Sequence, residues 1–293
     1  MINRLAIIGV GLIGGSLARA VRDAGQAREI IGHGRGIENL QRAVALGVID
    51  RVETTLATAV RDADMVVLAT PVGSMGKILR EIAPYLAPAA VVTDVGSVKG
   101  AVVDTARKSL GKRFSHFVPG HPIAGTEKSG VEASFASLYA GRRVVLTPLP
   151  ETKDEAVARV RAMWQAAGAE VLTMTVEHHD TVLAATSHLP HLLAYTLVDM
   201  LARQNDGPEI FSYAAGGFRD FTRIASSDPV MWRDIGLANR DAIVRLLKQY
   251  RTELGNLIKA VDNGDGEALL TVFARAKAAR DALAAVDQKR DEP

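Results

Sequence analysis

The chain has 293 residues, of which 48% are hydrophobic, and its 35 Lys and Arg against 33 Asp and Glu give a formal net charge of +2. Because domains average roughly 150 residues, this length indicates about two domains, each large enough to bury its own core. The sequence contains no cysteine, which excludes a disulfide scaffold, a thiolate metal site and a cysteine nucleophile.

The distribution of charge and hydropathy argues against a protein that binds nucleic acid or spans a membrane. Acidic and basic residues alternate along the chain, without a long basic run. Every long apolar stretch is interrupted well before the roughly 20 residues that a membrane helix needs. Residues 1–18 lack the charged leader and the cleavage site of a signal peptide. We therefore expect a cytoplasmic protein with no nucleic-acid or membrane partner.

In the first half of the chain, short aliphatic runs alternate with segments of helical period. The runs, which predict strands, are residues 5–10, 29–34, 65–70, 91–96, 117–122 and 143–148. Runs that are apolar throughout are typical of strands in a parallel sheet covered by helices on both faces. Segments 12–24 and 74–85 are long enough for crossover helices, and a further helix at 153–167 and strand at 170–175 are expected. This pattern predicts a doubly wound α/β domain over residues 1–176.

After Glu177 the strand-like runs almost stop. Residues 179–204 predict a long apolar helix that Pro190 should kink, because proline removes a backbone donor. Further helical periods occupy residues 228–261 and 265–286, and residues 287–293 are expected to form a solvated tail. We predict a second, all-α domain over residues 177–293. Its first helix is too apolar for a lone surface helix, so it should pack within its own domain or against a second subunit.

A glycine pattern between the first predicted strand and helix indicates a dinucleotide site. Gly9, Gly11 and Gly14 form G-x-G-x-x-G, in which a tight turn lets backbone amides approach a pyrophosphate at the positive end of a helix. The α/β domain is thus predicted to be a Rossmann-type dinucleotide-binding domain. The cofactor contacts expected in this turn are Gly9, Gly11, Leu12, Ile13 and Gly14.

The end of the second predicted strand bears on which cofactor is bound. Enzymes that use NAD usually place Asp or Glu there, whereas this chain has Gly34 followed by Arg35. A guanidinium can bind the 2′-phosphate of NADP, which a carboxylate would repel. Gly34 and Arg35 are therefore expected to contact the cofactor and to favour NADP over NAD. The alternative is that Arg35 stacks on the adenine or lies in solvent.

Two polar segments follow predicted strands and should lie at the carboxyl edge of the sheet, where such folds bind ligands. They are DVGSVKG at 94–100 and PGHPIAGTEKSG at 119–130. In the second, expected to be a loop, His121 lies between glycine and proline. A neutral imidazole held there can accept a proton at neutral pH. His121 is therefore the candidate general base, and the company of Thr126, Glu127, Lys128 and the upstream Ser97 favours that role.

These motifs together resemble those of the prephenate/arogenate dehydrogenases of tyrosine biosynthesis. The resemblance runs in family order through GVGLIGGSLA, TPV, TDVGSVKG, GHPIAGTEKSG, SHLPHLLAYTL and GGFRDFTRIASSDPVMWRDI. It implies a helical dimerisation domain, a homodimer, and oxidative decarboxylation of prephenate or arogenate with hydride transfer to a nicotinamide cofactor. Thr70 and Pro71 of the TPV motif are then expected to contact that cofactor.

The resemblance also implies roles for individual residues. His121 is the base that takes the substrate's hydroxyl proton, and Ser97 orients that imidazole or shares the hydroxyl contact. Arg223 holds the side-chain carboxylate, with Asp220 and Glu127 as anionic neighbours. The substrate contacts implied are Ser97, His121, Thr126, His191, Gly216, Arg223 and Trp232. His188 is expected to be a packing residue or a residue that supports a substrate contact. No metal is expected, because His188 and His191 lack a third ligand.

Other readings of the sequence remain open. A β-hydroxyacid dehydrogenase has the same layout but uses a lysine on its helical domain, where this chain offers histidines. A redox sensor that binds the dinucleotide without catalysis would not need His121, Ser97 and Arg223 together. The keto and amino substrates are not distinguished by any residue. The sequence is expected to have no regulatory domain after the helices.

Overall fold

The computed structural model describes residues 1–291 and divides into two compact units, residues 1–243 and residues from Val244 onward. The predicted domain boundary at residue 176 is a different division of the chain and stays a prediction. The expectation for the tail falls in part on residues 292 and 293, which lie outside the described residues. Within residues 1–291, no helix is both long and apolar enough to span a bilayer.

The first unit is built on a six-stranded sheet with the order β3-β2-β1-β4-β5-β6, and every neighbouring pair is parallel. The strands are β1 (Ile2–Ile8), β2 (Ala27–His33), β3 (Arg51–Val52), β4 (Met65–Leu68), β5 (Val91–Asp94) and β6 (Phe117–Val118). This order is typical of dinucleotide-binding domains, in which the ligand crosses the edge where β1 and β4 lie together. The sequence prediction missed β3, which has only 2 residues.

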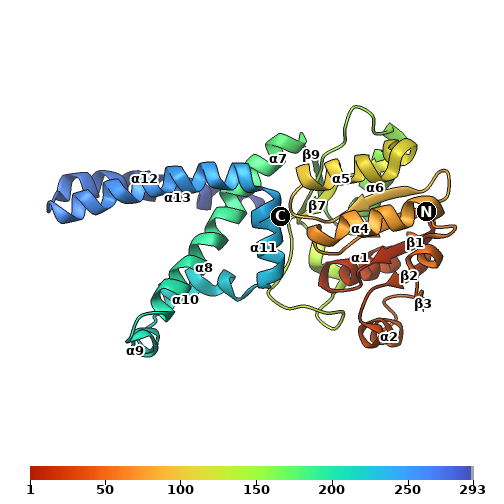
Figure 1. The fold of residues 1–293 in the computed structure, drawn as a ribbon, viewed down its shortest axis with the longest axis horizontal. Helices are drawn as coiled ribbons and strands as arrows, with labels where there is room; N and C mark the ends of the chain where they lie inside the picture. The colour runs from red at the N-terminus through yellow and green to blue at the C-terminus, as the bar shows by residue number, and fades with distance from the viewer. Residues whose placement is uncertain (292–293) are drawn as a thin grey trace. The chain divides into compact units, whose positions relative to one another are not determined.

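Alternating residues of β1 supply the two cores of the sheet, since successive side chains of a strand point to opposite faces. Leu5 and Ile7 pack with α1 (Leu12–Asp23), α2 (Ile37–Ala45) and α6 (Asp154–Ala166). Ala6 and Ile8 pack with α3 (Leu56–Val60), α4 (Val72–Ile82) and α5 (Gly100–Leu110) on the other face, where α4 and α5 lie side by side (Figure 1). The expected covering of both faces by helices is therefore confirmed.

A second sheet of three strands, in the order β7-β8-β9, carries part of the candidate site. Its strands are β7 (Gly120–Pro122), β8 (Arg143–Leu146) and β9 (Glu170–Thr173), with β7 antiparallel to β8. The single strand predicted at 117–122 was therefore wrong, because Pro119 separates β6 from β7 and the two belong to different sheets. The strands expected at 143–148 and 170–175 exist but do not extend the parallel sheet.

Helices follow from Val176 onward, and the long predicted helix occurs in parts. They are α7 (Val176–Leu183), a π-helical turn (Ala184–His188), α8 (Leu189–Ala202), α9 (Gly207–Ser212), α10 (Gly216–Thr222) and α11 (Pro229–Ala238). Pro190 lies in the first turn of α8, directly after the π-helical turn. Local π-helical turns are one way in which a helix departs from a straight axis. Of the residues of α8, Ala194 alone is buried within the described chain, which leaves the second subunit as the expected cover.

The second unit contains most of α12 (Arg240–Asp262) and α13 (Gly266–Asp291). The connection turns at Gly264, whose φ of +63° lies in the left-handed region that favours glycine. Exposed apolar side chains on these helices are Leu254, Ile258, Val261, Leu270 and Phe273. Such exposed apolar surface is typical of a face that a partner chain covers.

Candidate active site

The glycine-rich turn after β1 is shaped by close packing. Gly9 has φ +103°, and a β-carbon there would lie 2.3 Å from the backbone oxygen of Ala69. A β-carbon on Gly14 would lie 2.2 Å from the backbone oxygen of Gly9. Neither position therefore tolerates a side chain. At Gly11, by contrast, a β-carbon would meet no atom within 4 Å.

The space at Gly11 fits a dinucleotide phosphate. Gly11 caps the start of α1, and no side chain accepts a hydrogen bond from the first amides of this helix. The first N–H groups of a helix have no partner inside the helix and attract anions. Glycine keeps the approach to them open, so backbone amides of the turn and the first residues of α1, Leu12 and Ile13, are available to a pyrophosphate.

The other predicted cofactor residues lie at the ends of strands next to β1. Thr70 and Pro71 follow β4, and the methyl carbon of Thr70 would lie 3.0 Å from a β-carbon on Gly9. Gly34 and Arg35 follow β2, and Arg35 is exposed. All of them therefore lie at one edge of the sheet, as expected for a dinucleotide that crosses it. Their roles remain predictions.

Asn39 of α2 ties the glycine-rich turn to the segment that follows β7. Its side-chain Nδ2 donates to the backbone oxygen of Val10 at 2.6 Å, and its Oδ1 accepts from the backbone N–H of Val131 at 3.0 Å. The sequence analysis did not identify this residue, because no local pattern pairs positions 92 residues apart.

His121 lies on β7 rather than in the loop expected from the sequence, and a buried ion pair holds the residue before it. Lys99 and Asp94 are fully buried and paired with each other. Lys99 Nζ donates to the backbone oxygen of Gly120 at 2.6 Å, while Asp94 Oδ1 accepts from the Gly120 N–H at 3.3 Å. Both backbone polar groups of Gly120 are thus hydrogen-bonded, which fixes the backbone from which the His121 side chain extends.

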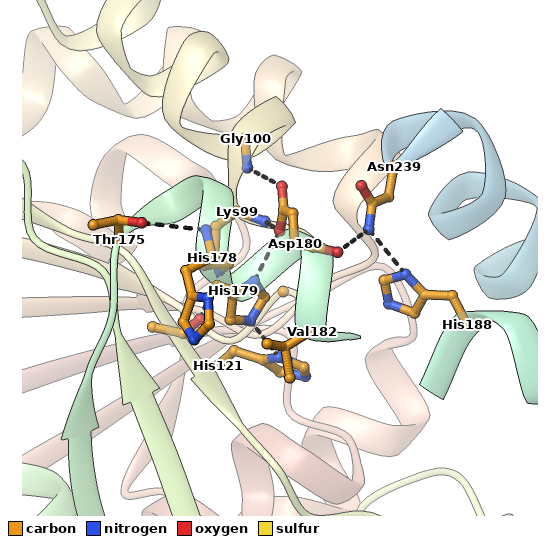
Figure 2. Close-up of polar contacts among 12 residues, drawn as sticks. Lys99, Gly100, His121, Thr175, His178, His179, Asp180, Val182, His188 and Asn239 are labelled. Atoms are coloured by element: carbon orange, nitrogen blue, oxygen red, sulfur yellow. Dashed lines mark hydrogen bonds and ion pairs between the residues drawn. The ribbon is translucent and has the colours of Figure 1, made fainter. Parts of the chain in front are cut away.

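A hydrogen-bonded chain links His121 to a carboxylate (Figure 2). Nδ1 of His121 lies 2.9 Å from Nε2 of His179, and Nδ1 of His179 lies 2.8 Å from Oδ1 of Asp180. A carboxylate only accepts hydrogen bonds, so His179 carries its proton on Nδ1 and accepts through Nε2. His121 must then donate through Nδ1. This leaves Nε2 of His121 as the nitrogen that can accept a proton.

The electrostatic surroundings favour a neutral His121 and an ionised Asp180. Burial lowers the pKa of His121 well below its ordinary value of 6.5, and the neighbouring His179, Lys99 and His188 side chains lower it further. Burial alone would raise the pKa of Asp180, but hydrogen bonds from His179 and from the backbone amides of Lys99 and Gly100 bring it below its ordinary value. The His121–His179–Asp180 relay therefore joins an anionic Asp180 to a neutral His121 at neutral pH.

Asp180 also holds the turn that carries Ser97. Its Oδ1 and Oδ2 accept the N–H groups of Lys99 and Gly100, each at 2.8 Å. Ser97 itself is half-buried in the turn between β5 and α5. Nδ1 of His121 is bonded to His179, and no hydrogen bond joins His121 to Ser97 within residues 1–291, so orientation of the imidazole by Ser97 stays a prediction. A contact of Ser97 with the substrate hydroxyl remains a prediction.

Arg223 follows α10 and forms an ion pair with Glu127, as expected. Asp220, the other expected neighbour, makes no ion pair with Arg223 among residues 1–291. The Arg223 side chain is 61% exposed, so its guanidinium is accessible to a carboxylate ligand. Thr126 is exposed and accepts a hydrogen bond from the Lys128 N–H at 3.2 Å.

His191 and Trp232 form a stacked pair with ring centroids 3.7 Å apart. His191 donates through Nδ1 to the backbone oxygen of Ser187 at 2.9 Å, which leaves its Nε2 as an acceptor or, when protonated, a donor. Trp232 is buried against Val98 and Ile235. Gly216 begins α10 and is exposed. The sequence analysis missed His179 and Asp180, although they are the first two residues of the apolar helix that it identified.

Comparison with known proteins identifies the family. The nucleotide-binding domain of prephenate dehydrogenase matches residues 17–173, and the dimerization domain of prephenate dehydrogenase matches residues 175–275. These matches cover most of the chain. The chain belongs to the prephenate dehydrogenase family. The family expected from the motifs, and a Rossmann-type domain followed by helices, are confirmed.

Similar proteins cover nearly the whole chain. The cyclohexadienyl dehydrogenase of Zymomonas mobilis is 39% identical over 283 residues, or 96% of each chain. The prephenate dehydrogenase from Aquifex aeolicus, solved with hydroxyphenyl propionate and NAD+, matches with a TM-score of 0.89 and 38% identity over 97% of this chain and 99% of that chain. The arogenate dehydrogenase of Synechocystis has a TM-score of 0.79 and 30% identity over 96% of this chain and 99% of that chain.

Proposed function

We propose that the protein catalyses the oxidative decarboxylation of prephenate, arogenate or both, with hydride transfer to a nicotinamide cofactor. The observation that carries this proposal is the His121–His179–Asp180 chain. It leaves a neutral imidazole nitrogen as a proton acceptor beside the edge where the dinucleotide is expected. The redox-sensor alternative has no need of such a base.

The chemistry requires one proton acceptor. The cofactor, when bound, accepts the hydride from the ring carbon that bears the hydroxyl group. Nε2 of His121 takes the hydroxyl proton as that carbon is oxidised, and the charge formed on the rings is balanced by Asp180 through His179. The ring carboxylate departs as carbon dioxide, and the electron pair that it leaves makes the ring aromatic with the oxygen as a phenolate. His121 then returns the proton to that oxygen. Ser97, from its turn beside α5, shares the contact with the hydroxyl.

The substrate has two carboxylates, and the proposed contacts supply a cation and several polar groups. Arg223 binds the side-chain carboxylate through its planar guanidinium, which suits a bidentate contact better than lysine does. Glu127 holds that guanidinium before the substrate arrives. The remaining proposed contacts are Thr126, His191, Gly216 and Trp232.

The cofactor proposed is NADP in preference to NAD. Arg35 lies at the end of β2 with an exposed side chain and forms no ion pair among the described residues. It is thus available to the 2′-phosphate, and Gly34 leaves no carboxylate to repel that group. The Aquifex aeolicus relative was solved with NAD+, so this preference is a specific feature proposed for the present chain.

The assembly proposed is a homodimer in the cytoplasm. Residues 175–275 match a dimerization domain, and α8 is apolar yet mostly unburied within the described chain. A second copy that covers this helix satisfies both observations. We place the boundary between the nucleotide-binding and dimerisation domains at residues 176 and 177, where the strands end and the helices begin.

The deciding experiment measures reduction of the nicotinamide with prephenate and arogenate, each with NAD and NADP. Oxidation of at least one of the two substrates is expected, with a lower KM for NADP than for NAD. Dinucleotide binding without oxidation of either substrate would support a redox sensor. Oxidation of a β-hydroxyacid instead would support the other alternative, for which α7 and α8 offer no lysine.

A further inference from the structure

His188 is buried at the end of the π-helical turn, with 1% of its surface exposed. Its Nδ1 lies 3.1 Å from Nδ2 of Asn239, whereas its Nε2 has no hydrogen-bond partner within residues 1–291. A buried donor or acceptor left unpaired costs about 1–3 kcal/mol. π-Helical turns occur frequently at functional sites. Both facts indicate that His188 does more than fill space.

Asn239 determines which nitrogen of His188 carries the proton. Nδ2 of Asn239 also donates to the backbone oxygen of Asp180 at 2.8 Å. That oxygen can only accept, so the amide must point its NH₂ group toward both neighbours (Figure 2). Nδ1 of His188 is therefore an acceptor. A neutral His188 then carries its proton on Nε2, as a donor.

The ring is neutral at working pH. The pKa of His188 is lowered to about 4, chiefly by burial. The neighbouring His179 and His191 act in the same direction, while Asp180 and the Ser97 backbone act in the opposite direction. His188 is thus unprotonated on Nδ1 and remains a single, fixed donor. A histidine with a fixed tautomer can orient a neighbouring group without changing charge.

The turn that carries Ser97 lies beside this donor. Trp232 meets the His188 ring edge to face, with ring centroids 6.1 Å apart, and packs in one cluster with Val98, the residue after Ser97. The Ser97 backbone also raises the pKa of His188, although Nε2 has no hydrogen-bond partner within residues 1–291. Catalytic hydrogen bonds are often long without substrate and tighten in the complex. The N–H groups of Lys99 and Gly100, on the far side of the same turn, are already held by the Asp180 carboxylate.

We propose that Asn239 and His188 are positioning residues that set the Ser97 hydroxyl against the substrate. Asn239 fixes the Nε2–H tautomer of His188, and that N–H donates to the Ser97 carbonyl in the substrate complex. Asp180 then organises both catalytic groups. Its carboxylate acts through His179 on His121, and its backbone carbonyl acts through Asn239 and His188 on Ser97. The proposal rests on the proposed function through the role of Ser97.

The test combines a tautomer measurement with a double-mutant cycle. Nitrogen-15 NMR of labelled histidine is expected to show His188 protonated on Nε2 in the parent. In Asn239→Asp the carboxylate accepts from the ring, so the proton should move to Nδ1 or the ring should become charged. Because this readout needs no turnover, it remains valid even if prephenate and arogenate prove not to be substrates.

In kinetics, Asn239→Leu is expected to lower kcat about tenfold, the effect of one hydrogen bond. In a Ser97→Ala background the same substitution should have little further effect, since Asn239 acts through Ser97. In a His121→Asn background its full effect should persist. Tyr195→Phe is the matched control, because the Tyr195 hydroxyl donates to the Ser227 backbone at 2.6 Å in the same cluster.

Specific outcomes contradict the proposal. An Nδ1-protonated His188 in the parent would overturn the tautomer assignment. A kcat for Asn239→Leu equal to that of Tyr195→Phe, or an undiminished effect in the Ser97→Ala background, would show that Asn239 is merely structural. If Asn239→Leu does not fold, His188→Gln replaces it in the cycle. The glutamine amide keeps a donor near the Nε2 position, so it should retain more activity than His188→Leu.

Discussion

The imidazole rings of His121 and His179 meet edge to face, with Nδ1 of His121 2.9 Å from Nε2 of His179 and ring centroids 5.1 Å apart. The two residues come from β7 and α7 and are 58 positions apart in the sequence. Their contact determines which nitrogen of His121 can take up a proton. Turnover is therefore expected to depend on a helix of the C-terminal half as well as on the strand that carries the base.

Replacement of His121 by asparagine should lower kcat by a factor of about 10² to 10⁴, the usual contribution of a general base. The asparagine side chain can still donate a hydrogen bond to His179, but an amide is not basic enough to accept the substrate proton. Cofactor affinity, measured by fluorescence titration, is expected to stay nearly unchanged because the glycine-rich turn is untouched. Turnover within a few-fold of the parent enzyme would contradict the assigned role.

Replacement of Asp180 by asparagine tests whether its carboxylate acts in catalysis or only stabilises the start of α5. The variant loses the charge that stabilises the protonated rings, so kcat is expected to fall at least about tenfold. It also weakens the start of α5, which should cost about 1 kcal/mol of unfolding free energy.

Thr175→Ala is the matched control for Asp180→Asn. Thr175 accepts the His178 N–H at the start of α7, and its loss should also cost about 1 kcal/mol. The Thr175 side chain makes no hydrogen bond to a member of the relay, and the backbone bond from the His179 N–H to the Thr175 oxygen is kept in alanine, so kcat should match that of the parent. Equal kcat values for the two variants would refute a catalytic function of the Asp180 carboxylate.

The pH dependence of kcat/KM follows from the His121 environment. Because burial lowers the pKa of His121 well below 6.5, the base stays unprotonated as the pH falls through that value. The acidic limb of kcat/KM in the free enzyme should therefore lie below pH 6.5, and the rate should be flat between pH 6.5 and 7. An acidic limb of kcat/KM that is centred at or above pH 6.5, and that disappears in His121→Asn, would contradict the lowered pKa of His121.

Replacement of Arg223 by alanine should raise KM far more than it lowers kcat, because the guanidinium binds a group remote from the reacting carbon. Arg223→Lys should recover part of the affinity, since it keeps the charge but loses the bidentate fork. Arg240→Ala serves as the control, because Arg240 is 73% exposed and pairs only with its neighbour Asp241. An unchanged KM in Arg223→Ala would count against the substrate contact.

Replacement of Arg35 by glutamate should reverse the cofactor preference. The carboxylate repels the 2′-phosphate of NADP and can accept from the ribose hydroxyls of NAD. We expect the ratio of the Kd values for NADP and NAD to rise by about a factor of ten or more, as a change in one charged contact of about 1.5–3 kcal/mol implies. Arg28→Glu, at a charged position earlier in β2, controls for the change in net charge. A ratio that responds equally to both variants would remove Arg35 from cofactor selection.

The sequence predicted those features that depend on local pattern. The turn around Gly9 and Gly14 could be recognised because close packing there excludes any side chain. Buried strands such as β4 and β5 are apolar throughout, as the parallel sheet requires. β3 was not predicted because 2 residues give no periodicity. The division of residues 117–122 into two strands at Pro119 was not predicted either, because it depends on tertiary pairing with two different sheets.

The relay could not be predicted in this way. His179 and Asp180 look like the polar start of an amphipathic helix, and nothing local shows that α7 packs against α5 and β7. The same holds for Asn239, which meets Asp180 across 59 positions and His188 across 51. Residues that act by contacting each other across the fold are visible only once the fold is known.

The placement of His121 on β7 separates the position of the proton acceptor from the exposed segment that follows it. The strand is fixed by its pairing with β8 and by the Lys99–Asp94 pair, whereas residues 123–130 directly after it carry the exposed Thr126 and Glu127. Substitutions in this adjoining stretch are therefore expected to alter the substrate contact proposed for Thr126 while the imidazole keeps its position. Substrate selectivity can then evolve without a matching change in the proton acceptor.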